Sequence, residues 1–386
     1  MPTQQILLGA GGESITGGQT TALGGRDAYH GGTGAMTPSC TNSGTGSPTI
    51  AMGTKGGSAG NSYSNIYSWV CPSDVNYISV VVAGAGGGGG GGQIVDYYVP
   101  YVGDIYHKYT GGGGGGGGLA YINGLAVTPG TTYYLAVGWG AAAVAGNNSG
   151  YLGGPSWFAT GYTGGSGTTP YSPTGSSLYA NGGQGGTYSS SRAVGGTAFA
   201  TTWTATAAYS GGYGGYAYNG GSNELGGGGG GGAAGYAGVG GNGSSFQSET
   251  SYTNATAGAG GGAGGGGGFY QHPTGGGGIG YLGEGSSGAA GVRTVTGTVA
   301  SHPNYLSSEF GQAGSGGSIG VEYNNTGTNF DYGTKTTAGI YGGGGRGNDG
   351  RANPGPGSPG FVRILWDSDN QGTHRTYPST NTGDMS

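Results

Sequence analysis

The stretch that decides the fold is Trp69–Gly92, WVCPSDVNYISVVVAGAGGGGGGG, in which a Val-rich strand pattern runs directly into seven consecutive glycines. Glycine loses more backbone entropy on folding than any other residue, so a run of this length is ordered only for a specific structural reason. Further glycine runs stand at 111–118, 226–232 and 264–268, with shorter ones at 275–278 and 342–345.

The composition argues that these runs are part of a fold and not linkers. Of 386 residues 108 are Gly and 30 are Tyr, and only 6% are charged. Disordered chains are charged and poor in aromatics, which is the opposite pattern. The glycines come in blocks without a Gly-X-Y register, so a collagen helix is excluded as well. The sequence therefore predicts an ordered structure built around the glycine blocks.

Polyproline-II geometry is the conformation that suits these blocks. A glycine run is a poor helix, and a glycine strand has no side chain to pack. A polyproline-II helix has three residues per turn and no internal hydrogen bonds, so its N–H and C=O groups point outward. Neighbouring helices can satisfy those groups only at a separation that a Cβ would prevent. We expect a bundle of such polyglycine-II rods, roughly 22–25 Å long at about 3.1 Å per residue, with Gly115, Gly229 and Gly266 inside it.

Short β-strands are expected to clamp the bundle at one end. Residues 67–72, 76–85, 131–140 and 360–366 have the β-branched and aromatic density of strands. We expect the strand that enters the glycine region to pair with the one that leaves it. The structural residues of this clamp are predicted to be Trp69, Val80, Val82, Ile364 and Trp366. The predicted fold is all-β and irregular, a sandwich-like clamp enclosing rods with essentially no α-helix.

Three regions follow from the composition. Residues 1–65 are polar and Gly-rich and are predicted to be an N-terminal attachment arm. Residues 66–366 form the glycine-rich domain, and residues 367–386 form a polar C-terminal tail, either a second arm or a disordered end.

The segments that open and close the glycine-rich region resemble those of glycine-rich domains in phage tail-fibre and adhesin proteins. The residues that carry the resemblance are Trp69, Pro72, Val80–Val82, Gly86–Gly92, Pro359, Gly360, Val362 and Ile364. The resemblance implies a polyglycine-II sandwich like that of T-even-type fibre-tip adhesins, in which loops at one end contact the bacterial surface. A glycine-rich extracellular module of certain receptor tyrosine kinases is similar in kind.

The function that this resemblance implies is that of a non-enzymatic virion protein. It would be assembled in the host cytoplasm, act outside the cell, bind other virion proteins and recognise a host-surface glycan or outer-membrane protein. A homo-oligomer is expected, a trimer if the protein is fibre-like. The alternatives are a capsid or tail decoration protein, or a secreted glycine-rich filament or matrix protein.

Recognition residues are expected in the segments between the rods, because binding on rigid scaffolds concentrates in emergent loops. Segment 93–110, QIVDYYVPYVGDIYHKYT, is rich in tyrosine, which offers rigid amphipathic contact area. In the alternative role, these tyrosines pack against the glycine rods and against one another and cover the side of the bundle. The receptor-binding candidates here are Tyr97, Tyr98, Tyr101, Asp104, Tyr106, His107, Lys108 and Tyr109.

Two further segments are candidates for contacts. Segment 151–218 is apolar and nearly uncharged, so Trp157, Phe158 and Trp203 are predicted to be buried at an interface with a neighbouring subunit, with a receptor contact as the less favoured alternative. Segment 293–341 carries more charge and is expected to be exposed, with His302, Glu309 and Tyr323 as candidate receptor contacts.

Several chemistries are not supported by the sequence. With 10 Lys and Arg against 15 Asp and Glu, the chain has no basic stripe that would bind nucleic acid. It also has no apolar run long enough to predict insertion into a membrane. No catalytic residue, cofactor or metal site is expected, because the five histidines lack ligand spacing and the G-x-S-x-G match at 316–320 precedes no helix. Cys40 and Cys71 are either free thiols or a disulfide, with free thiols favoured.

Overall fold

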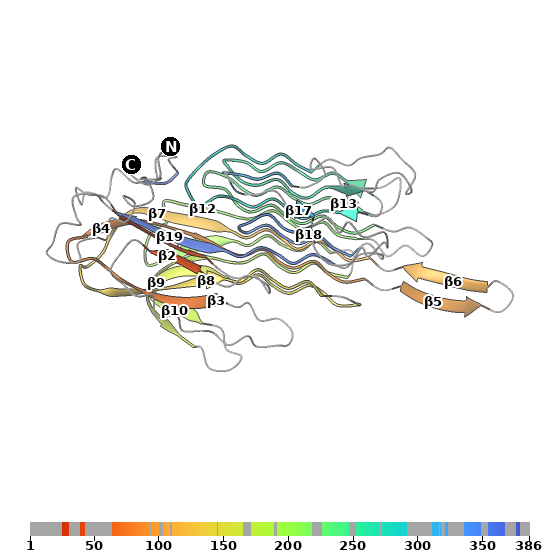
Figure 1. The fold of residues 1–386 in the computed structure, drawn as a ribbon, viewed down its shortest axis with the longest axis horizontal. Coiled ribbons are helices and arrows are strands. Elements are labelled where there is room, and N and C mark those ends of the chain that lie inside the picture. The colour runs from red at the N-terminus through yellow and green to blue at the C-terminus, as the bar shows by residue number, and fades with distance from the viewer. Residues whose placement is uncertain are drawn as a thin grey trace, which may run out of the picture.

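The computed structural model describes residues 25–30, 39–42, 64–92, 94–99, 103–108, 110–144, 146–164, 171–188, 191–217, 226–246, 252–269, 272–291, 311–315, 317, 321–322, 336–348, 354–366 and 376–378. These residues contain antiparallel β-strands and no helix, so the predicted all-β fold class is confirmed. Figure 1 shows two parts, a group of packed sheets at one end and a long bundle of extended segments that runs away from it.

Two sheets form the sandwich. The six-stranded sheet has the order β12-β7-β4-β19-β1-β2, with β12 at Ala207–Tyr209, β7 at Leu119–Ala126, β4 at Tyr77–Ala83, β19 at Phe361–Trp366, β1 at Gly25–His30 and β2 at Ser39–Asn42. The five-stranded sheet has the order β11-β10-β9-β8-β3, with β11 at Ala198–Thr201, β10 at Ser172–Ala180, β9 at Ser156–Thr163, β8 at Thr132–Gly138 and β3 at Ser64–Val70.

The strand that enters the glycine region pairs with the strand that leaves it, as predicted. β4 and β19 are antiparallel neighbours, with Val80 opposite Ile364 and Val82 opposite Val362. Every residue of β19 is buried, since both faces of this central strand are covered. The first and last strands of the rod region are thus joined directly, which closes the domain on itself.

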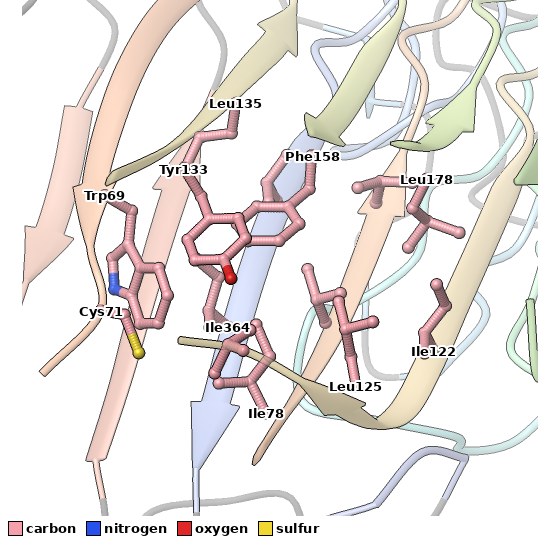
Figure 2. Packing of buried hydrophobic residues seen from close by; sticks show 14 of the residues in the cluster. Trp69, Cys71, Ile78, Ile122, Leu125, Tyr133, Leu135, Phe158, Leu178 and Ile364 are labelled. Carbon is pink, nitrogen blue, oxygen red and sulfur yellow. The ribbon is translucent and has the colours of Figure 1, made fainter. Parts of the chain in front are cut away.

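The main hydrophobic core lies between the two sheets (Figure 2). Trp69 of β3 contacts the rings of Tyr133, Phe158 and Trp366, with centroids 5.9, 6.2 and 6.0 Å away. Aromatic pairs in favourable geometries, such as the edge-on contact of Trp69 with Phe158, add about 0.5–1.5 kcal/mol to the free energy gained from burial. Val80, Val82 and Ile364 are fully buried in the same cluster. The sandwich is therefore an ordinary apolar core, in contrast to the bundle.

A second apolar cluster covers the other face of the six-stranded sheet. Val81, Leu119 and Phe361 pack there against Ala233, Tyr236 and Ala263 from the near ends of the rods. Tyr377, from the predicted C-terminal tail, stacks on Tyr236 with a centroid distance of 5.6 Å, and its backbone N–H donates to Asn123 Oδ1 at 2.9 Å. The central strands β4 and β19 are therefore buried on both sides, and Tyr377 of the tail belongs to this cover.

The region predicted as an N-terminal arm contributes to the sandwich. β1 pairs with β19 along its whole length, from Gly25 opposite Trp366 to His30 opposite Phe361, and β2 pairs with β1. The six-stranded sheet therefore extends beyond the predicted domain boundary at residue 66.

The glycine runs are polyglycine-II rods, as their hydrogen bonds show. Along 84–91 every third N–H donates to the same neighbouring segment: Gly84, Gly87 and Gly90 donate to the carbonyls of Gly118, Gly115 and Gly112, each at 2.9 Å. The residues between them donate to two other segments, 148–154 and 355–358. None of these glycines has a positive φ. A three-residue repeat with bonds only to other segments is the signature of a polyproline-II helix.

The rods form a lattice in which an inner rod has six neighbours. Each rod donates in three directions and accepts in three, because its groups repeat at three residues per turn. Rod 111–118 is bonded to or packed against segments 84–91, 181–187, 193–196, 211–215, 228–234 and 342–348. Rod 228–234 likewise has six neighbours, namely 111–118, 211–215, 241–244, 263–266, 274–277 and 342–348. The interior of the bundle is therefore almost pure backbone.

Candidate functional site

The rods run back and forth between the sandwich and a far end, which we call the tip. Rod 84–91 leaves β4 and rod 111–118 returns to β7 beside it. Gly84 bonds to Gly118 at the sandwich, and Gly90 bonds to Gly112 at the tip. Because the two rods are antiparallel and adjacent, residues 92–110 connect them at the tip.

This connection contains a β-hairpin made of β5 (Ile94–Val99) and β6 (Gly103–Lys108). In its register Asp96 is opposite Tyr106, Tyr97 opposite Ile105, Tyr98 opposite Asp104 and Val95 opposite His107. Figure 1 shows β5 and β6 projecting beyond the rods, at the end opposite the sandwich. Six receptor-binding candidates of this segment thus lie on one hairpin, namely Tyr97, Tyr98, Asp104, Tyr106, His107 and Lys108. Tyr101 and Tyr109 lie outside the described residues.

Two smaller hairpins lie at the same end of the bundle. β13 (Ser245–Phe246) pairs with β14 (Tyr252–Thr253), and β15 (Gly268–Phe269) pairs with β16 (His272–Pro273). Both join an outgoing rod to a returning one. The tip therefore combines connections that are far apart in sequence.

An arginine that the sequence analysis did not select stands at this end. The Arg192 guanidinium lies 5.7 Å from the centre of the Tyr216 ring, and its Nη2 donates to Thr253 Oγ1 at 3.1 Å. Arg192 is exposed. Its spacing is the sequence signal that could have identified Tyr216. Ser210, Tyr213 and Tyr216 recur every third residue, which places them along one side of a rod, while glycines occupy the other two sides.

Three further receptor-binding candidates belong to segment 293–341. His302, Glu309 and Tyr323 lie outside the described residues. The flanking residues are at the tip side of their rods, because the N–H of Gly311 donates to Gly275, two residues after β16. Farther along, β17 (Val321–Glu322) pairs with β18 (Thr336–Thr337).

The interface candidates lie in the sandwich. Phe158 has no exposed surface and packs in the core, stacked on Tyr133 at 5.4 Å and on Trp203 at 5.9 Å. Trp157 is also fully buried, on the opposite face of β9. Trp203 is partly buried. Contact with another subunit stays a prediction, and of the three side chains Trp203 retains exposed surface for it.

The reactive groups in the described part of the chain are few. Cys71 is a free, buried thiol whose Sγ donates to the Val75 carbonyl at 3.3 Å. Its burial, with a smaller contribution from the nearby Asp74 carboxylate, raises the pKa of the thiol to about 12, so it stays protonated at neutral pH. Among the described residues no group of three or more His, Cys, Asp or Glu could hold a metal ion. The same part of the chain contains no helix long and apolar enough to cross a membrane.

The fold defines a class, that of rigid glycine-rich domains in which a β-sandwich anchors a polyglycine-II bundle. A family model described as a glycine-rich domain matches residues 62–292, and the chain belongs to this glycine-rich domain family. The match begins just before β3 and includes the hairpin β5–β6. None of the curated proteins compared with the chain matches it.

Proposed function

We propose that this protein is a structural protein of a phage virion, at the tail fibre or its tip, and that it contacts a host-surface glycan or protein through the hairpin β5–β6. The observation that carries the proposal is the position of this hairpin. It joins two adjacent rods and projects from the end of the bundle opposite the sandwich.

The mounting of the hairpin supports a binding role. Rods 84–91 and 111–118 are both hydrogen-bonded along their length to several neighbours, so the base of the hairpin is held by a rigid scaffold. Binding residues on such scaffolds are typically carried by emergent loops. The segment is also rich in tyrosine, the residue that gives large contact area at low conformational cost.

The virion assignment is supported by the opening and closing segments around Trp69 and Ile364, which resemble those of phage fibre adhesins. In this arrangement the sandwich end would face the virion and the tip would face the host. The decoration-protein alternative predicts instead that the tip contacts other virion proteins.

The test replaces Tyr101, Tyr106 and Tyr109 together with Ala in the phage that encodes the protein. We expect at least a tenfold slower adsorption to host cells with normal incorporation of the protein into particles. The control replaces Tyr77 and Tyr213, which are 40% and 46% exposed on the sandwich and on a rod, and it should adsorb normally. Loss of incorporation would favour the decoration role, and unchanged adsorption would remove the hairpin from the binding site.

A further inference from the structure

The outer face of the five-stranded sheet carries a set of aromatic side chains. The side chains of β8 to β11 that face the main core are Leu135, Phe158, Leu178, Ala198 and Ala200. Strand alternation directs their neighbours to the other face. One row across the sheet then reads Ala136, Trp157, Tyr179 and Phe199, in direct register.

The aromatic rings on this face hold one another in place. Tyr134 meets Tyr162 edge-on at 4.9 Å, Tyr162 meets Tyr171 edge-on at 5.8 Å, and Tyr179 stacks on Phe199 at 5.1 Å. Trp157 lies buried beneath, in contact with the cluster. The rings are therefore ordered before any ligand arrives, so little side-chain entropy is lost on binding.

Part of this aromatic surface is open to solvent. Phe199 is 43% exposed and Tyr162 is 37% exposed, while Tyr134, Tyr171 and Tyr179 are half-buried. Exposed aromatic rings gathered on one sheet face are a feature of binding surfaces. We call Tyr134, Tyr162, Tyr171, Tyr179 and Phe199 the tyrosine face.

The chemistry of the surrounding strands selects the kind of partner. β8 to β11 contain no Asp, Glu, Lys, Arg or His. Their polar groups are hydroxyls, such as Thr201 Oγ1 and Ser177 Oγ, which bond to each other at 2.7 Å, and Thr160 Oγ1, which accepts from the Ser176 N–H at 3.2 Å. A charged ligand would lose hydration on these strands without gaining an opposite charge, whereas an uncharged ligand needs no such partner.

We propose that the tyrosine face binds an uncharged glycan. The C–H groups on one side of a pyranose ring carry partial positive charge and stack on the negative face of an aromatic ring. Tyrosine and threonine hydroxyls at the edges of the rings can exchange hydrogen bonds with sugar hydroxyls. The face offers two ring groups for such stacking, Tyr134–Tyr162–Tyr171 and Tyr179–Phe199.

This site differs from the proposed receptor contact. The tyrosine face belongs to the sandwich, whereas the hairpin β5–β6 is at the tip (Figure 1). The inference does not rest on the virion function. The Tyr101, Tyr106 and Tyr109 triple variant should keep glycan binding at the tyrosine face, and a change there should leave the hairpin intact.

The experiment uses the full chain in native gels that contain soluble polysaccharide, with neutral dextran, glucomannan and mixed-linkage β-glucan as probes and anionic polygalacturonate as a contrast. We expect retardation by at least one neutral polymer and none by polygalacturonate. Calorimetry with the hexasaccharide of the retarding polymer then gives a Kd. Retardation by none of the neutral polymers would overturn the proposal.

The decisive variant is Tyr162→Ala with Phe199→Ala, since these are the two most exposed rings and their removal leaves the buried Trp157 in place. We expect at least tenfold weaker binding at unchanged melting temperature. The Tyr77→Ala, Tyr213→Ala control should bind as the unaltered protein does, and Tyr162→Trp should retain binding. If the double variant unfolds, the single changes Tyr162→Ser and Phe199→Ser replace it.

Two outcomes would contradict the inference directly. The first is a double variant that binds the glycan as tightly as the unaltered protein. The second is concentration-dependent dimerisation in sedimentation that the double variant abolishes, because the face would then be covered by a second copy of the chain.

Discussion

At the scale of single residues, glycine is the packing residue of this protein. A Cβ built on Gly229 would meet the carbonyl group of Gly266 on the next rod, 2.8 Å from its carbon, and a Cβ built on Gly115 would lie 2.8 Å from the carbonyl carbon of Val194. These are backbone atoms that cannot turn aside as a flexible side chain would. Apolar side chains stabilise the sandwich, while their absence permits the bundle.

Replacing Gly115 with Val should therefore destabilise the domain strongly. The new side chain would push segment 193–196 away and break bonds such as Gly196 N–H to Gly116 O, now 2.8 Å. Each stranded backbone group costs about 1–3 kcal/mol, so a loss of about 3 kcal/mol or more is expected in denaturant unfolding. The control is Ala142→Val on an exposed rod position, which should change stability little. An equal loss in both variants would mean that β-branching, and not close packing, is the cause.

At the scale of elements, the outer rods require a way to satisfy the groups that face no further rod. Side-chain amides do so at several positions. Asn242 Oδ1 accepts from the Tyr213 N–H at 2.9 Å, and Gln184 Oε1 accepts from the Val194 N–H at 3.3 Å. On an outer rod, a side-chain amide can thus accept the backbone N–H bond that an inner rod donates to the carbonyl of another rod.

Asn242→Ala should remove one of these caps and lower the unfolding free energy by about 0.5–1.5 kcal/mol, the usual net value of such a bond. Asn242→Asp keeps an acceptor at the same place and should retain most of the stability. Both are measured by chemical denaturation. If Asp loses as much as Ala, the Oδ1 acceptor is not what stabilises this rod.

At the scale of the whole molecule, we expect the sandwich and the rods to unfold as one unit, to which the hairpin is an addition. β4 and β19 join the start and the end of the rod region, and the second apolar cluster ties rod ends to the sheet. The hairpin β5–β6 emerges where Gly90 already bonds to Gly112. The two rods are therefore held together at the tip without it.

Replacing residues 93–109 with Asn-Gly should leave the melting temperature within about 2 °C, which corresponds to about 1 kcal/mol for a domain of this size. Calorimetry on the purified chain measures this, and adsorption measures the separate effect on binding. A chain that no longer melts cooperatively would show that the hairpin is part of the stabilising structure.

Local pattern alone determined the central strands and the rods of this protein. Val80–Val82 and Phe361–Trp366 predict strands because β-branched and aromatic residues favour them, and the glycine blocks predict polyproline-II rods because no other regular structure suits them. Burial of Trp69 and the absence of helix from the described residues also agree with the composition. For the candidate site, the sequence identified segment 93–110 by its tyrosines, but its hairpin register and its position at the tip required the three-dimensional arrangement.

Only the tertiary structure decided which rod lies beside which. One glycine run is chemically the same as another, so nothing in the run 111–118 specifies its six neighbours; the strands that anchor each rod do. Tertiary structure also decided the surroundings of Trp157 and Phe158. These adjacent residues of β9 point to opposite faces of the sheet, and a different cluster packs on each face. The tertiary structure likewise explains β1, whose short polar sequence becomes a sheet strand only because β19 offers it an edge. Local propensity selected the conformations, and long-range pairing at the sandwich selected their order in space.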